Sequence, residues 1–370
     1  MGKKVQKSVR IFGADFMLDK VQGIEDEIDG ALIGKDIEYI HRLRVASRRL
    51  RAAFRCFNDC LPNKKLDNWQ DETKRITRTL GNARDLDIQI DLLDRLYQDE
   101  LDDKFKPGYR RLLLRIKQRR TKAQKKVNKV LDQLKEQRIL IKMRAYLEKL
   151  ANKSKGSYLF TPSLYQKAFS VINTALEEFL TYEKFVYEPE NVKELHAMRI
   201  ACKHLRYSLE IFVPVYNKSL LPYVQIMKDI QDHLGAIHDA DVWVDWLPKF
   251  IEDEEERIEA YFGNTGPLKR LLPGLNHFIE DRKRARSEAY QSFLSTWETL
   301  QAENAWESLK EIIGAPINIE AALEYLVEEE TIDADEGDKP IEETKEMAAE
   351  PSDSSTSEPD TVEPDQTSSS

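Results

Sequence analysis

The sequence predicts an all-α protein built as two similar helical bundles, followed by an acidic tail. No convincing stretch of alternating apolar and polar residues occurs in the 370 residues, whereas apolar residues recur at helical spacing in most segments. A basic helix and the motif that follows it each occur twice, at offsets of 155 and 154 residues. Two matches at nearly one offset indicate a tandem duplication. We therefore expect two halves, over about residues 15–155 and 160–313.

The first half is expected to hold a series of helices after an irregular lead-in over residues 1–17. Residues 18–33 show mild helical periodicity, and residues 40–57 form the clearest helix, with Asp36 as N-cap. The next helix spans 66–80, and Gly81 is expected to end it as a C′ glycine. Asp85 or Asp87 would then cap a helix that runs to about Leu101. After a break at 107–108, residues 109–150 predict one or two long basic helices.

The second half repeats this order after a junction at residues 151–163. Helices are expected over 164–182, 195–212, 220–234, 241–262, 275–300 and 302–313. Asn191 and Glu194 resemble a capping box in front of the second basic helix. After about residue 328 the chain is rich in Glu, Asp, Ser, Thr and Pro and poor in aromatic residues, which predicts a disordered tail over 328–370.

The helix at 40–57 carries cations on one face and apolar side chains on the opposite face. The cationic face holds His41, Arg44, Arg48, Arg51 and Arg55. The second copy repeats it with His196, Arg199, Lys203 and Arg206, while Glu210 stands in the place of Arg55. A solvated helix face usually mixes its charges, so an anion is expected on these two faces. His41 and His196 alone would suit a buried core, but their register with the arginines favours a site.

Charge is divided unevenly along the chain. The total net charge is −9, but residues 328–370 hold sixteen acidic residues and two lysines, a net −14, which leaves +5 for residues 1–327. Residues 104–155 are the most basic segment, with nineteen Lys or Arg against three acids. Such a body suits a polyanionic partner. The tail either occupies the basic site weakly, in competition with that partner, or only adds solubility.

Cysteine content and hydropathy give the expected location. Three cysteines without paired spacing argue against disulfides and a zinc site, and fit a reducing cytosol. The N-terminal residues lack an apolar core of signal-peptide length, and no apolar run approaches 18 residues. We therefore expect a cytoplasmic protein with no membrane partner, cofactor or metal.

The repeated motifs resemble those of the CHAD domain family. The pattern is His41-x-x-Arg44-Val-x-x-x-Arg49-Leu-Arg51, then Lys74 six residues before Leu-Gly-x-x-Arg84-Asp85. It covers both halves over roughly residues 15–310. The resemblance implies a CHAD domain over 1–314, with two pseudo-symmetric four-helix bundles flanking a basic groove that binds inorganic polyphosphate. It leaves association with polyphosphate granules or granule proteins open. No strands of a companion CYTH enzyme domain are visible, so the domain is expected to stand alone.

The candidate phosphate-binding residues are cations of the two basic helices, of the helices that follow them and of the long helices. Lys74 and Arg78 share one face, Lys228 repeats Lys74, and Arg119 corresponds to Arg282 when the long helices are aligned on Ile116 and Ile279. The full set is His41, Arg44, Arg48, Arg49, Arg51, Arg55, Lys74, Arg78, Arg119, His196, Arg199, Lys203, Arg206, Lys228 and Arg282.

The aspartate motifs and the basic charge also allow other functions. Arg84-Asp85-x-Asp87 and His238-Asp239-x-Asp241 could be a metal or acid–base pair, although helix caps or internal Arg–Asp pairs are favoured. A nucleic-acid-binding protein fits the charge, but aromatic residues do not interleave with the cations as single-strand binding requires. A polyphosphate-processing enzyme would need a phosphate-cradling glycine loop, which is not seen. Polyphosphate binding without catalysis is the leading prediction.

Overall fold

The computed structural model describes residues 6–98, 101–151 and 161–314, and all regular structure in these segments is helical. They hold ten α-helices and three short 3-10 turns, without a strand. This confirms the predicted all-α class. The acidic tail and most of the predicted junction lie outside the described residues. None of the helices described is long and apolar enough to cross a membrane.

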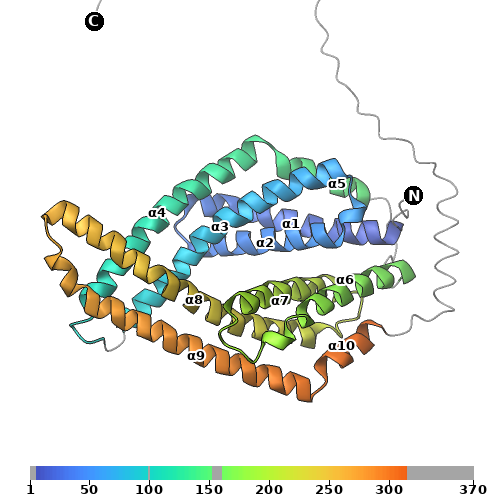
Figure 1. Cartoon of the computed structure of the whole chain (residues 1–370). Helices are drawn as coiled ribbons and strands as arrows, with labels where there is room; N and C mark the ends of the chain where they lie inside the picture. Colours follow the sequence, from blue (N-terminus) through green and yellow to red (C-terminus); the bar gives the residue numbers. More distant parts are fainter. Residues whose placement is uncertain (1–5, 99–100, 152–160, 315–370) are drawn as a thin grey trace, which may run out of the picture. The chain divides into compact units, whose positions relative to one another are not determined.

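The helices follow one another in two runs of five (Figure 1). In the first run, α1 packs on α2 and α5, α2 on α3, and α3 on α4. In the second, α6 packs on α7 and α10, α7 on α8, and α8 on α9. The bounds of the first run are α1 Lys7–Ile33, α2 Ile37–Cys56, α3 Asn63–Gln98, α4 Lys106–Glu136 and α5 Ile139–Ala151. Those of the second are α6 Pro162–Leu180, α7 Val192–Phe212, α8 Leu221–Phe262, α9 Leu272–Ala302 and α10 Ala305–Ile313.

The two runs meet mainly through the pairs α1–α6, α2–α7 and α4–α9. One contact is aromatic: the ring of Phe212 lies 5.8 Å from that of Phe12 and 5.9 Å from that of Phe57, measured between centroids. These rings belong to a core cluster that spans both runs. A second core is built from the C-terminal halves of α3 and α8 and the N-terminal halves of α4 and α9. Leu93 and Phe278 are fully buried in it. The long helices converge there in Figure 1.

The crossing of α4 and α9 depends on two glycines. A Cβ atom on Gly274 would lie 2.0 Å from the carbonyl oxygen of Phe105, and one on Gly108 would lie 2.5 Å from that of Leu271. Real Cβ atoms do not approach backbone this closely, so the helices reach this separation because both positions lack a side chain. The expected break at 107–108 is therefore the start of α4, with Pro107 in its first turn.

The expectation of an irregular lead-in over residues 1–17 is wrong from residue 7 onward, and residues 1–5 lie outside the described segments. Helix α1 begins at Lys7, and Ile11, Ala14 and Met17 are buried in it. Gly13 hides the helical pattern, but it is needed because a Cβ there would lie 2.8 Å from the ring of Phe57. Tertiary packing thus overrides the low helix propensity of glycine.

The expected helix ends at Gly81 and before Asp85 or Asp87 are also wrong. Helix α3 runs through all three positions, and α8 likewise joins the segments expected over 220–234 and 241–262. Only Gly34 and Gly263 among the described glycines have the positive φ of a left-handed cap. Gly81 is therefore an ordinary helical residue, and the two aspartates are free for other contacts.

Two further caps were predicted, at Asp36 and Asn191, and one of them forms. The side chain of Asp36 accepts a hydrogen bond of 2.8 Å from the backbone N–H of Glu38, which confirms Asp36 as the N-cap of α2. Asn191 occupies the N-cap position of α7 without a side-chain capping bond. Its amide instead donates to Glu188 at 2.9 Å, so the predicted capping box does not form.

Candidate anion-binding site

The cationic faces of α2 and α7 come together where these two helices pack. Two guanidinium groups lie over the ring of Tyr207, with the Cζ atom of Arg48 5.8 Å and that of Arg206 5.1 Å from its centroid. The ammonium of Lys203 lies close enough to Arg199, Arg48 and Arg44 for their charges to lower its pKa. We call the set Arg44, Arg48, Arg199, Lys203 and Arg206 the basic cluster.

The repeated Leu-Gly-x-x-[Arg/His]-Asp motif supplies the neighbours of two cluster arginines. Asp85 on α3 faces Arg44 on α2, with 3.6 Å between Oδ1 and Nη2. Asp239 on α8 faces Arg199 on α7 in the same way, at 4.0 Å. Both aspartates are exposed, and ion pairs this long and exposed contribute little. They orient the guanidinium groups without neutralising the cluster.

The glycine of each motif lies beside the same arginine. An added Cβ atom at Gly81 would be 3.5 Å from the Nε atom of Arg44, and one at Gly235 would be 3.8 Å from that of Arg199. Each guanidinium therefore lies against the backbone of the following long helix. The motif is a packing surface for a cation, which explains why it recurs at the offset of the basic helix.

The second aspartate of each motif has a structural partner. Asp87 is buried and accepts a hydrogen bond from Nε of Arg120 at 2.6 Å, which ties α3 to α4. Asp241 accepts from Nε of Arg286 and ties α8 to α9. The second aspartate of each motif therefore pairs with an arginine of the following long helix and not with a residue of its own motif, and it does not cap a helix. Over the described segments no group of three or more His, Cys, Asp or Glu side chains is placed to hold a metal.

The basic cluster and its surroundings contain buried N–H groups that lack an acceptor. A buried donor without a partner destabilises a fold by about 1–3 kcal/mol, and more when charged, so such groups are rare. In the described part of the chain, such groups occur on the indoles of Trp297 and Trp306, and the others gather on α2, α3 and α7. The latter are the Nε–H groups of Arg44, Arg48, Arg84, Arg199 and Arg206, of which that of Arg206 lies 3.5 Å from a carboxylate oxygen of Glu210.

Burial and mutual repulsion change the protonation of this region. Burial, followed by the charges of Arg199, Arg48 and Arg44, lowers the pKa of Lys203 to about 7. Burial is also the main cause that lowers the pKa of His196, and with Arg199 it lowers that of His238 to about 4. The site therefore resists further positive charge.

His238 and Arg84 belong to the site, although the sequence did not place them there. The Nδ1 atoms of His196 and His238 are 3.0 Å apart. In the other half, Arg84 is close enough to His41 to lower its pKa, after burial. The two positions correspond at the offset of 154, and this shared register with the basic helices was the signal that could have identified them.

Several predicted site residues have other surroundings. Arg49 donates to Glu210 at 3.0 Å and so links α2 to α7 by an ion pair. Arg51 and Arg55 are exposed and lie near His204, whose pKa they help to lower. Lys74, Arg78 and Lys228 are exposed, and none of their described contacts joins them to the basic cluster.

Arg119 and Arg282, which were expected to correspond when the long helices are aligned on Ile116 and Ile279, have different neighbours. Arg119 lies over the ring of Trp246, with Cζ 4.9 Å from the centroid, and Arg282 donates to its neighbour Asp281 at 3.0 Å. The matching ion pairs to Asp87 and Asp241 instead relate Arg120 to Arg286. The long helices thus correspond in a different alignment from the one assumed.

Comparison with known proteins agrees with the motifs. A family model described as "CHAD domain" matches residues 17–248. Among solved structures, the chain is similar to the crystal structure of the CHAD domain from the plant Ricinus communis, with 19% identity, a TM-score of 0.51, and 88% of this chain and 94% of that chain covered. It is also similar to PptA from Streptomyces chartreusis, with 14% identity, a TM-score of 0.51, and 80% and 100% covered. No curated protein matches it. At these identities the structural likeness concerns the fold.

Proposed function

The chain belongs to the CHAD domain family, a family associated with polyphosphate binding, and we propose that it binds inorganic polyphosphate through the basic cluster without catalysing a reaction on it. The observation that carries the proposal is the set of buried Nε–H groups without acceptors on Arg44, Arg48 and Arg199. Phosphate oxygens would satisfy them. Arginine suits this task because its planar fork matches the geometry of phosphate oxygens.

The proposed site draws on a duplicated architecture. The main contacts between the two runs of helices join α1 to α6, α2 to α7 and α4 to α9, which are the counterparts at equal places in each run. Contacts between equivalent elements are what a two-fold relation requires. We infer two pseudo-symmetric bundles of four main helices, with the basic cluster at the α2–α7 contact. One polyanion chain could then touch both copies.

The nucleic-acid alternative is less well supported. Single-strand binders stack bases on free aromatic side chains beside a basic groove. Tyr207 is the aromatic residue described among the cluster cations, and the guanidinium groups of Arg48 and Arg206 both lie over its ring. The ring is therefore already in contact with the protein's own cations. Competition between polyphosphate and single-stranded DNA of equal charge distinguishes the two functions.

The test is calorimetric titration with polyphosphates of defined length at several salt concentrations. The double variant Arg48→Ala/Arg199→Ala removes one cation from each half. It is expected to lose at least about a hundredfold in affinity, since each charged hydrogen bond contributes about 1.5–3 kcal/mol. Affinity of the unaltered protein should fall steeply with salt because bound phosphates release counterions.

The matched control is Lys142→Ala/Lys269→Ala, which removes the same charge from two exposed positions, one in each half. It should keep nearly full affinity. An unchanged affinity in the Arg48/Arg199 variant, with helicity intact by circular dichroism, would contradict the proposal. Equal losses in both variants would mean that net charge alone attracts the polyanion. Release of phosphate from labelled polyphosphate would point to the enzyme alternative.

A further inference from the structure

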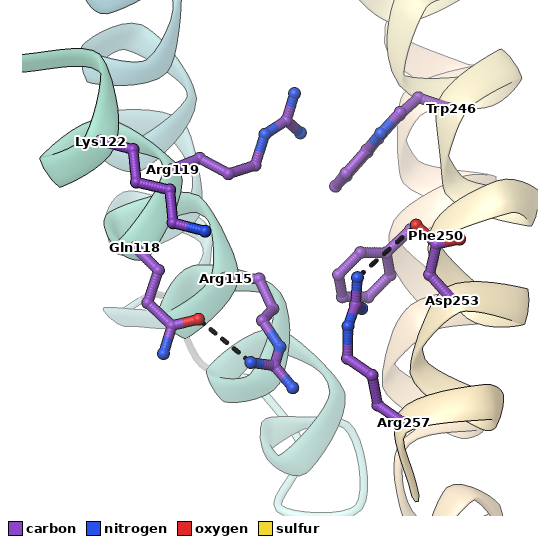
Figure 2. Close-up of a pocket in the computed structure, with 8 residues that line it drawn as sticks. All are labelled: Arg115, Gln118, Arg119, Lys122, Trp246, Phe250, Asp253 and Arg257. Carbon is purple, nitrogen blue, oxygen red and sulfur yellow. Dashed lines mark hydrogen bonds and ion pairs between the residues drawn. The ribbon is translucent and has the colours of Figure 1, made fainter. Parts of the chain in front are cut away.

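A separate cavity lies between α4 and α8, near the second core. Its volume is about 390 Å³, within the range of small-molecule sites. Figure 2 shows that its walls carry side chains from both helices that point toward one another. Cationic and aromatic groups face each other there. The lining residues are Arg115, Gln118, Arg119, Lys122, Trp246, Phe250, Asp253 and Arg257.

The cationic wall has more positive charge than its own acids neutralise. Glu254 is completely buried behind the cavity and accepts hydrogen bonds from Arg115 and Arg257 at 2.6 Å and from Arg111 at 2.9 Å. One carboxylate thus holds three guanidinium groups in place. Asp253 is the acid that lines the cavity, 3.7 Å from Arg257. An anion entering the cavity would meet fixed cations that have few acidic partners.

The aromatic wall offers the flat face of an indole. Trp246 packs against Phe250, with 5.0 Å between ring centroids, and against Trp243 at 5.6 Å, which fixes the orientation of its ring. The guanidinium of the exposed Arg119 lies over this ring at 4.9 Å. In Figure 2 it extends from α4 toward the indole across the cavity. An exposed arginine can swing aside or close over an inserted ring.

Cations and an indole face together select a particular chemistry. Inorganic polyphosphate has no group that uses an aromatic face, whereas a nucleobase stacks on tryptophan and under an arginine. We propose that this cavity binds a nucleoside polyphosphate, with the base between Trp246 and Arg119 and the phosphates on Arg115 and Lys122. The side chain of Gln118 also lines the cavity. This site shares no residue with the basic cluster and does not depend on polyphosphate binding there.

The test titrates the full chain with ATP and, separately, with tripolyphosphate, which has the phosphates without the base. Both titrations use the Arg48→Ala/Arg199→Ala protein as background, so that the basic cluster does not report on the phosphates. We expect ATP to bind at least about tenfold more tightly than tripolyphosphate. Trp246→Leu should remove this difference, and Arg119→Ala should lower ATP affinity at least about fivefold.

The matched control is Lys129→Ala, an exposed cation on α4 two turns beyond Lys122 and outside the cavity, which should bind ATP as the background protein does. Equal affinities for ATP and tripolyphosphate would overturn the proposal, as would an ATP affinity that Arg119→Ala leaves unchanged. If the Trp246→Leu protein does not fold, the comparison of ATP with tripolyphosphate and the ATP affinity of Arg119→Ala are sufficient to test the proposal. The outcome is independent of whether polyphosphate binds the basic cluster, since that cluster is already disabled.

Discussion

The pH dependence of polyphosphate binding should report on Lys203. Burial and the neighbouring Arg199, Arg48 and Arg44 lower the pKa of this lysine to about 7 in the free protein. Above pH 7 its folded form is therefore mostly neutral. A bound polyanion favours the charged form, so binding takes up a proton and affinity should fall as the pH rises.

The size of the effect follows from two pKa values. If phosphate contacts restore the ordinary pKa of lysine, about 10.4, raising the pH from 7 to 9 should weaken binding about fiftyfold. At pH 8 each binding event should take up about 0.9 proton, because about one Lys203 in ten is charged in the free protein at that pH. The histidines of the site have pKa values below their usual range, so they are neutral in the free protein over this interval.

The assay is calorimetric titration at pH 7, 8 and 9 in pairs of buffers with different ionisation enthalpies, which gives both affinity and proton uptake. Lys203→Arg keeps the cation but does not titrate in this range, so its affinity should vary far less with pH. Lys228→Arg, at an exposed position on α8, is the matched control and should behave as the unaltered protein does. A Lys203→Arg protein with the full pH dependence would refute the assignment to Lys203.

Three further substitutions test the packing and the charges. Gly274→Ala places a Cβ atom 2.0 Å from the carbonyl oxygen of Phe105, and it should lower the free energy of unfolding by about 1–3 kcal/mol in urea denaturation. The control is Gly23→Ala, whose Cβ would lie 3.6 Å from that of Ala46 and which should not destabilise the fold. Glu254→Gln leaves three guanidinium groups without their buried counter-charge and should destabilise by about 3–5 kcal/mol in the same assay; a loss below about 1 kcal/mol would show that the buried charge is dispensable. Glu210→Gln removes an acid beside the basic cluster and should raise polyphosphate affinity about threefold at low salt, a gain that screening removes at high salt and whose absence at low salt would contradict the argument.

The sequence predicted the features that depend on helical periodicity and on the internal repeat. The cationic stripe of α2 is visible because its apolar face is regular, and its second copy fixed the expectation that α7 carries the same surface. The contact of the two stripes followed from the repeat alone. The binding role of these residues stays a prediction, since it concerns a ligand and not the fold.

Local signals failed where a distant contact decides the conformation. Gly81 looks like a helix end, but the chain continues as helix there, and the position lies beside Arg44 of another helix. Gly13 likewise lies under Phe57, which is 44 positions away. A rule for glycine that uses only the local sequence considers the residue and its neighbours in the chain, and neither Arg44 nor Phe57 is among those neighbours.

The cavity with Trp246 was beyond sequence analysis for the same reason. Arg115, Arg119 and Lys122 lie on α4, whereas the aromatic wall and Arg257 lie on α8, more than a hundred residues later, and the two helices belong to different runs. Arg119 was identified only as a cation of a long basic helix. Nothing in its local sequence shows that its guanidinium lies over an indole.

The helices that carry the basic cluster are held together by apolar contacts. The ring of Phe57, directly after α2, packs with Phe212 of α7, and both rings belong to the core that spans the two runs. Burial in these contacts opposes the repulsion among the cations, so the fold keeps a site that is unfavourable when empty. A bound polyanion removes that repulsion and binds only the folded state. Its stabilisation should therefore grow with free ligand as RT ln(1 + [L]/Kd), and the unfolding temperature should rise with polyphosphate in the unaltered protein and not in the Arg48→Ala/Arg199→Ala variant.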